Sequence, residues 1–220
     1  MKKLILFLIL LLCITGCTKK EEVKPVEEES ETQETTETIP EEQDSEDFKI
    51  LVICFSMKGE QYNVGVIEEG NTYIVAQMIR DYFDADYIAV HPEEGRYPDT
   101  YKELTEVAKA EQNENARPPY MFPILDPQEY DLIFIGAPVW WGDWPMIMYT
   151  VFENNDFSGK TLVPFCTHEG SGLSGFDKKL QDACPDSTVL KGLAIRGSDA
   201  QNKRDDTKKV VEDFLKESGY

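Results

Sequence analysis

Basic residues are scarce in this sequence: 22 lysines and arginines stand against 42 aspartates and glutamates, and the formal net charge is −20. Nucleic acid is bound through a basic surface, so this balance argues against nucleic acid as a partner. Histidine occurs twice, and the five cysteines include no CxxC pair. A zinc site needs closely spaced Cys and His ligands, so no metal site is expected.

The amino terminus has the pattern of a secretory signal. Lys2 and Lys3 precede the apolar run Leu4–Ile14, which is too short to cross a bilayer as a helix. The run ends in Ile-Thr-Gly-Cys, which resembles the bacterial lipobox, where a small residue precedes a cysteine. The resemblance implies cleavage before Cys17 and a lipid on Cys17. Residues 1–17 would then be a lipoprotein signal, and the protein would be extracytoplasmic and anchored to a bacterial membrane. An ordinary signal peptide or an uncleaved anchor is the alternative.

Residues 18–47 contain no aromatic side chain, thirteen Asp or Glu and three Lys. Such a segment buries too little apolar surface to fold, so we expect a disordered acidic tether. The rest, residues 48–220, has the size of one domain. It contains 29 acidic and 17 basic residues, a net charge near −12 once the preceding residues are subtracted from the totals.

Strand-like apolar runs alternate with helical periodicity through this domain. Strands are expected at residues 48–55, 86–91, 132–135, 160–166 and 189–195, and helices at residues 71–83, 101–112, 145–152, 176–184 and 203–217. Gly136 and Pro138 are expected to end the third strand. Five β-α repeats joined by right-handed crossovers predict an α/β fold with a parallel sheet and helices on both faces.

The turns after the first, third and fourth strands should meet at the carboxyl edge of the sheet. The first turn ends in Gly70-Asn71-Thr72 at a helix start, where backbone amides and the helix dipole favour an anion. Ser56 adds a hydroxyl group. The motif includes no Lys or Arg and is not a P-loop, so its amide and hydroxyl donors suit a monophosphate held without a metal.

The second turn carries Trp140 and Trp141 beside Gly142. Their rings suit a planar ligand, although a pair packed between helix and sheet is equally consistent with the pattern. We expect Trp141 to stack on a ligand and Trp140 to pack inward. The third turn, Thr-His-Glu-Gly-Ser-Gly, allows close approach of backbone to a ligand, and places His168 beside it.

Together these turns resemble those of the flavodoxin-like family, in the branch whose second turn reads P-[IV]-W-W. The resemblance implies a three-layer sandwich, a five-stranded parallel sheet of order 2-1-3-4-5, and non-covalently bound FMN. It implies that the phosphate is held by Ser56, Gly70, Asn71 and Thr72, that the ring is flanked by Pro138, Val139, Trp140, Trp141 and Gly142, and that its far side meets Thr167, Gly170 and Gly172.

One departure from the family pattern lies in the first turn, where some eleven extra residues, Glu60–Gly70, separate the Ser and Asn-Thr parts of the motif. If this insert folds away from the sheet, the phosphate site can form as the resemblance implies. If the insert covers the site, the family's phosphate-binding residues cannot be assigned to this sequence. Tyr62 in the insert would shield the flavin or dock a partner.

The acidic balance opposes formation of a reduced, anionic flavin, and no nicotinamide-binding motif is evident. We therefore expect a low-potential electron carrier that serves a redox partner protein or a small-molecule donor or acceptor. An FMN-dependent NAD(P)H or quinone oxidoreductase is the alternative, with His168 or Tyr62 positioning a substrate or donating a proton. A non-redox ligand-binding lipoprotein is the alternative of another class.

The domain has three cysteines, so at least one of them is expected to be a free thiol or to form an intermolecular disulfide. In a 2-1-3-4-5 sheet, Cys54 and Cys166 lie two strands apart, about 9–10 Å, which is too far for a disulfide. Both should be buried free thiols, and Cys184, before a proline, should be more exposed.

Overall fold

The computed structural model describes residues 48–121 and 126–219. The signal, Cys17 and the acidic tether expected from the sequence lie outside these residues. None of the helices in the described ranges is long and apolar enough to span a bilayer.

The described chain alternates strands and helices. The main sheet contains β1 (Ile50–Phe55), β4 (Asp86–Val90), β5 (Leu132–Pro138), β6 (Thr161–His168), β7 (Thr188–Val189) and β8 (Leu193–Arg196), and a separate hairpin contains β2 (Gly59–Gln61) and β3 (Gly65–Ile67). The helices are α1 (Asn71–Phe83), α2 (Tyr101–Glu114), α3 (Met146–Asn154), α4 (Phe176–Ala183), α5 (Gly197–Asn202) and α6 (Arg204–Glu217), with a 3-10 turn at Pro127–Glu129.

The main sheet is parallel and has the order β4-β1-β5-β6-β7, with β8 also paired to β6. This confirms the α/β flavodoxin-like sandwich and the predicted order 2-1-3-4-5. The predicted fifth strand is wrong in one respect, because it is divided into β7 and β8. Val189 pairs with Leu162, and Leu193 pairs with Phe165. Between these two pairings the edge strand advances by four residues while β6 advances by three. The extra residue interrupts the pairing, as a bulge does.

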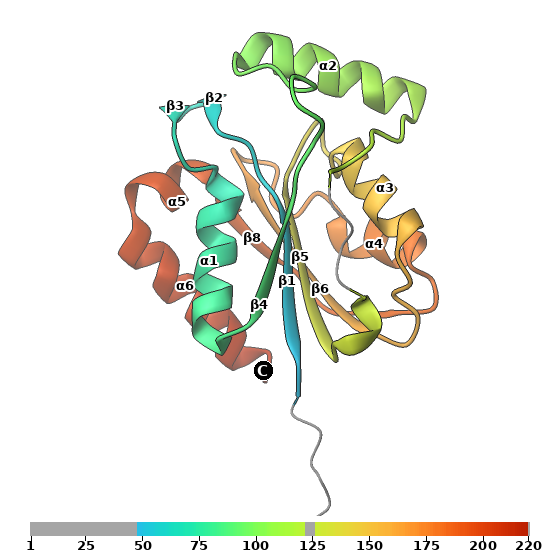
Figure 1. Ribbon diagram of the computed structural model, residues 1–220. Helices are drawn as coiled ribbons and strands as arrows, with labels where there is room; N and C mark the ends of the chain where they lie inside the picture. Colours follow the sequence, from blue (N-terminus) through green and yellow to red (C-terminus); the bar gives the residue numbers. More distant parts are fainter. Residues whose placement is uncertain (1–47, 122–125, 220) are drawn as a thin grey trace, which may run out of the picture. The chain divides into compact units, whose positions relative to one another are not determined.

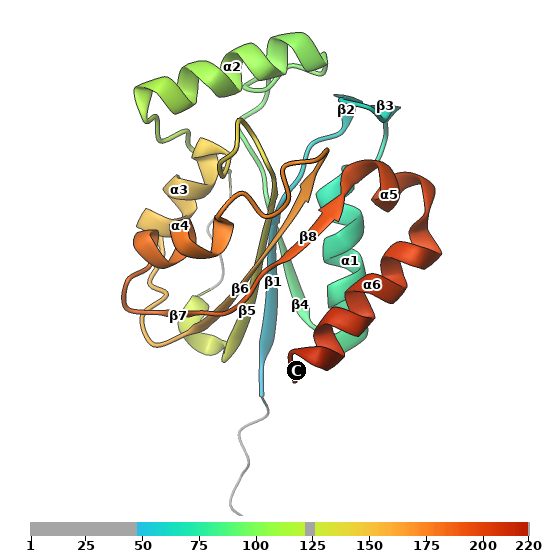
Figure 2. The same ribbon diagram turned by 180° about the vertical axis from the view of Figure 1, so that it is seen from behind.

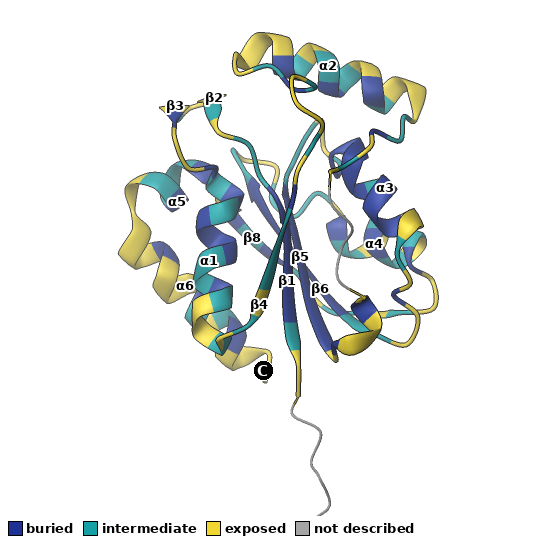
Figure 3. Cartoon of the chain, in the orientation of Figure 1, coloured by how far each residue is buried: buried dark blue, intermediate teal, exposed yellow. Residues whose placement is uncertain are grey.

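Helices cover both faces of the sheet (Figures 1 and 2). The helices α3 and α4 pack on one face, and α1, α5 and α6 pack on the other. Figure 3 shows the central strands β1, β5 and β6 buried between these layers, because each alternates side chains into two separate apolar clusters. Helix α2 differs from the rest: it lies across the carboxyl ends of the strands (Figure 1).

The third strand continues through Gly136 to Pro138, so the expected break at Gly136 is wrong. Gly136 pairs with Cys54 on one side and Phe165 on the other. A Cβ atom on Gly136 would lie 2.1 Å from ring carbons of Phe165. The glycine is therefore part of the strand, and its missing side chain leaves room for the buried Phe165 ring.

Cys54, Cys166 and Cys184 are all free and buried. The strand β5 lies between the first two, as the predicted strand order requires. Cys184 is 7% exposed and is the most exposed of the three, as expected, although it is still buried at the end of α4 in the apolar cluster. Burial raises the pKa of the Cys166 and Cys184 thiols to about 12.

Candidate functional site

A cavity of about 220 Å³ opens at the carboxyl edge of the sheet, beneath α2. Eight of the residues singled out in the sequence line it: Tyr62, Asn71, Pro138, Val139, Trp140, Trp141, Thr167 and His168. Six others do not belong to its lining: Ser56, Gly70, Thr72, Gly142, Gly170 and Gly172. The three predicted turns therefore do converge, but each contributes only part of its motif to the cavity itself.

The first and third turns are joined by a buried hydrogen bond. The hydroxyl oxygens of Thr72 and Thr167 are 2.6 Å apart, and both residues are at most 3% exposed. Ser56 Oγ accepts from the backbone N–H of Tyr73 at 3.0 Å, so Ser56 satisfies one of the free amides at the start of α1. A Cβ atom on Gly70 would lie 2.1 Å from Ser56 Oγ, so this close approach requires glycine.

The insert forms the β2-β3 hairpin and packs against the amino end of α2. The N–H of Glu60 donates to the carbonyl of Asp99 at 2.8 Å, and Glu60 Oε2 accepts from the N–H of Tyr101 at 2.9 Å. Tyr62 stacks on Tyr101 with ring centroids 5.6 Å apart. The hairpin thus forms a wall of the cavity through Gln61 and Tyr62, and Asn71 still lines the cavity.

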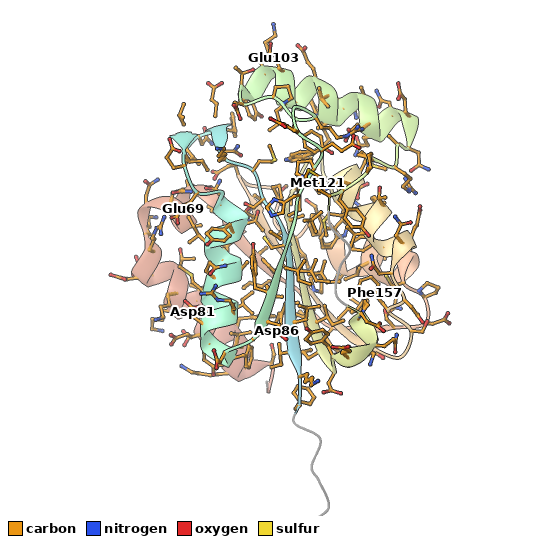
Figure 4. All side chains as sticks on the ribbon, viewed as in Figure 1. Glu69, Asp81, Asp86, Glu103, Met121 and Phe157 are labelled. Carbon is orange, nitrogen blue, oxygen red and sulfur yellow. The ribbon has the colours of Figure 1, made fainter. Side chains whose placement is uncertain are left out.

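The end of the insert is tied to the carboxyl-terminal helices. Glu69, labelled in Figure 4 near α1, pairs with Arg204 at 2.8 Å, and its carbonyl accepts from Gln201 Nε2 at 2.6 Å. Contacts at both ends hold the hairpin in place beside the cavity.

Helix α2 forms the roof of the cavity through Leu104, Thr105 and Ala108. Its position was not foreseen from the sequence. The spacing of Leu104 and Ala108 indicates a buried face, but not that this face meets a cavity edge instead of the sheet. Glu103, on the outer side of α2, points away from the domain (Figure 4).

Trp141 is held against this roof. Its indole Nε1 donates to the carbonyl of Thr105 at 3.0 Å, and its own carbonyl accepts from Gln112 Nε2 at 3.3 Å. The ammonium of Lys109 lies 5.1 Å from the indole centroid, a cation–π contact. Trp141 is nevertheless 55% exposed, so part of its ring is open to solvent at the cavity.

The second turn has an unusual backbone that explains the position of Trp141. Trp140 and Asp143 exchange two backbone hydrogen bonds of 3.0 Å, and Trp141 and Gly142 between them have φ of 51° and 73°. Two positive φ values are typical of a type I′ turn. A non-glycine residue in this region costs about 1–2 kcal/mol, and the contacts of Trp141 with α2 offset that cost.

Trp140 packs inward from the same turn. Its ring meets Phe55 edge-on at 5.4 Å and Tyr97 edge-on at 5.1 Å. The hydroxyl of Tyr97 donates to the buried carboxylate of Glu111 at 3.0 Å, and Arg96 donates to the other carboxylate oxygen. The aromatic wall is thereby connected to α2 through a buried charge pair.

The third turn is organised by His168 and Glu169. Nδ1 of His168 accepts from the backbone N–H groups of Gly170 at 2.9 Å and Gly172 at 3.2 Å. Glu169 accepts from the N–H and the hydroxyl of Ser198 at 2.6 and 3.1 Å. Burial lowers the pKa of His168, and the positive charge of Arg196 lowers it further, while Glu169 acts in the opposite direction.

Among the described residues, the cavity lining contains no lysine or arginine, and Glu169 is its one carboxylate. Its other polar side chains carry hydroxyl, amide and imidazole groups, and they belong to Gln61, Tyr62, Asn71, Tyr101, Thr105, Thr167 and His168. Within residues 48–121 and 126–219, no three His, Cys, Asp or Glu side chains converge as metal ligands would. The site can bind a ligand through neutral donors, acceptors and aromatic faces.

Fold and site define a doubly wound α/β protein with a ligand cavity at the edge where the strand order reverses. A family model described as Flavodoxin matches residues 49–214. The chain belongs to the flavodoxin family.

Solved structures agree with this assignment. One described as a flavoprotein from Bacteroides eggerthii DSM 20697 has 25% identity and a TM-score of 0.61, covering 76% of this chain and 96% of its own. Another, from Bacteroides uniformis ATCC 8492, has 27% identity and a TM-score of 0.60, covering 75% and 98%. A flavoprotein from Lactobacillus acidophilus NCFM in complex with FMN has 20% identity and a TM-score of 0.56, covering 71% and 97%, and shows the shared fold. A search of curated proteins finds no match.

Proposed function

We propose that this protein binds FMN at the carboxyl-edge cavity and transfers electrons, and that a lipid on Cys17 tethers it to the outside of a bacterial membrane. The observation that carries the proposal is the cavity itself. It combines exposed aromatic surface on Trp141 with a start of α1 that is rich in neutral donors, in a chain of the flavodoxin family.

The residues present fit a flavin with a hydroxylated side chain. Asn71 Oδ1 is buried and has no hydrogen-bond partner in the described part of the chain. An unpaired buried acceptor is costly, and a hydroxyl group of a ligand would satisfy it. A Cβ atom on Gly197 would lie 2.4 Å from Asn71 Nδ2, so glycine at 197 leaves space for the Asn71 side chain.

Each turn would then have one task. Asn71 and the amides at the start of α1 would hold the polar chain and phosphate, with Ser56, Gly70 and Thr72 shaping that turn. Pro138, Val139 and the two tryptophans would flank the ring. Bound flavin supplies one-electron and two-electron transfer, and the protein sets its potential.

Charge favours an electron carrier over a nicotinamide-dependent enzyme. In the part of the chain that the structure describes, the cavity lining offers no Lys or Arg to the phosphates of a dinucleotide. The acidic domain opposes the additional negative charge of a reduced flavin, which favours a low potential, and it attracts a basic partner.

A second candidate, an FMN-dependent quinone reductase, is favoured by one observation. The stacked pair of Tyr62 and Tyr101 stays exposed at the cavity, by 54% and 37%, and offers a face to a planar substrate.

Purification of the full chain in detergent tests the proposal. The expected preparation is yellow, releases FMN on denaturation, and shows two resolved one-electron steps on reductive titration. Trp141→Ala should weaken FMN binding, whereas Val210→Ala, on the exposed side of α6, should not. Steady turnover of NADPH with a quinone would support the second candidate. A colourless protein that leaves the fluorescence of added FMN unquenched would refute flavin binding.

The anchor is tested separately by metabolic labelling with a radioactive fatty acid. The full chain should incorporate the label, and Cys17→Ala should not. Equal labelling of the two proteins would exclude Cys17 as the lipidated residue.

A further inference from the structure

The side chain of His168 is held in one orientation by its own turn. Its Nδ1 accepts from two backbone N–H groups, those of Gly170 at 2.9 Å and Gly172 at 3.2 Å. A ring nitrogen that accepts hydrogen bonds carries no proton. In a neutral imidazole the proton is therefore on Nε2.

The backbone of the turn produces this arrangement. Gly170 and Gly172 have φ of 125° and 63°, which L side chains rarely adopt. A Cβ atom at either position would meet nothing within 4 Å, so the glycines are required by conformation and not by space. This conformation directs both N–H groups at Nδ1.

Protonation of His168 would place an N–H on Nδ1, facing two N–H donors. Burial and the charge of Arg196 also favour the neutral ring by lowering its pKa. Glu169 opposes this, but its carboxylate is already held by the N–H and hydroxyl of Ser198. Tyr62 and Tyr101 also line the cavity and contribute hydroxyl groups to it.

The Nε2–H group is left for the cavity. His168 belongs to the cavity lining, its Nδ1 is used by the turn, and the described residues provide Nε2 with no hydrogen-bond partner. A neutral donor at this place requires an acceptor from a ligand. The ring system of a flavin presents such acceptors as carbonyl oxygens and unprotonated ring nitrogens.

We propose that His168 is a fixed, neutral Nε2–H donor that hydrogen-bonds an acceptor atom of the bound flavin ring and does not transfer a proton. This inference rests on the proposed flavin binding and adds the role of one residue. The hydrogen bond becomes stronger as electron density on the acceptor rises, so it stabilises the reduced ring more than the oxidised ring. His168 thus contacts the flavin directly and raises both the affinity for flavin and its midpoint potential.

Histidine NMR of the full chain with ¹⁵N-labelled imidazoles tests the tautomer. The chain has two histidines, so the variant His91→Gln assigns both spectra. The expected spectrum of His168 is that of the Nε2–H tautomer from pH 6 to pH 8, with and without FMN. A proton on Nδ1, or titration of His168 within that range, would overturn the proposal.

Two variants test the hydrogen bond to flavin. His168→Leu removes the donor at similar volume, and His168→Gln retains an N–H donor. His168→Leu should bind FMN about tenfold more weakly, the equivalent of one hydrogen bond, and should have a lower midpoint potential. His168→Gln should restore most of both, and Gly170→Ala, which disturbs the turn, should resemble the leucine variant.

These experiments distinguish an error in the proposed role of His168 from an error in the proposed flavin binding. Equal FMN affinity and potential for wild type and His168→Leu would overturn the role of His168 while leaving flavin binding intact. A wild-type chain that binds no FMN would overturn both. Near-UV circular dichroism of each variant establishes that the fold is retained before binding is compared.

Discussion

Glu111 connects the roof helix to the aromatic wall, and its removal should destabilise the protein measurably. The residue is 6% exposed. Its Oε1 accepts from Arg96 Nε and Nη2 at 3.1 and 2.9 Å, and its Oε2 accepts from the Tyr97 hydroxyl at 3.0 Å. Glu111→Ala would leave both donors without this partner.

The magnitude follows from the burial of the pair. Breaking a buried ion pair costs about 3–5 kcal/mol. The side chain of Arg96 is 28% exposed, so water recovers part of its solvation, and we expect a loss of about 2–3 kcal/mol in the free energy of unfolding. For a domain of this size, each kcal/mol corresponds to roughly 2–4 °C in Tm, so the melting temperature should fall by about 4–12 °C.

The assay is urea unfolding of the full chain followed by near-UV circular dichroism, with Glu106→Ala as the matched control on the same helix. The Lys102–Glu106 pair is 4.0 Å long with side chains 86% and 68% exposed, and such a surface pair contributes about 0.5 kcal/mol or less. Equal losses for Glu111→Ala and Glu106→Ala would refute the argument. A lower FMN affinity in Glu111→Ala is also expected, because Tyr97 would no longer be fixed beside Trp140.

Two further predictions concern the sheet and its thiols. Gly136→Ala places a methyl group against the buried Phe165 ring and should cost about 1–3 kcal/mol by overpacking, seen as a lower urea midpoint. A midpoint equal to that of the wild type would contradict this. At pH 8, alkylation followed by peptide mapping should leave Cys54, Cys166 and Cys184 unmodified until the domain is unfolded, because burial excludes the reagent and raises their pKa; rapid modification of any of them in the native protein would show that its surroundings open.

Local patterns predicted the elements well where burial is one-sided or complete. Helix α1 begins at Asn71 and ends at Phe83, as the apolar spacing indicates. The division of the fifth strand could not be predicted, because it depends on how β7 and β8 are aligned with β6. The position of α2 was missed for a similar reason: periodicity identifies the face of a helix that is buried, but not the surface it is buried against.

The candidate site shows the same limit. The sequence predicts that the three turns approach one another, and the Thr72–Thr167 hydrogen bond joins two of them. It does not show that the amides of Gly170 and Gly172 serve His168, because that depends on the φ values of the turn. The sequence pattern around the roof residues Leu104 and Ala108 indicates a buried helix face and does not indicate that this face lines a cavity.

The strand β1 runs from Ile50 to Phe55, and Phe55 packs beneath Trp140 at the cavity end. Six residues of strand extend about 20 Å at roughly 3.3 Å each, so the described chain enters the domain at the sheet edge opposite the cavity (Figure 1). The tether proposed for residues 18–47 would therefore join the domain at the end of β1 that is opposite the cavity. The proposed redox partner would meet the domain at the other end of β1, where Phe55 and Trp140 lie, so the point where the tether joins the domain and the proposed electron-transfer site are separated by the length of one strand.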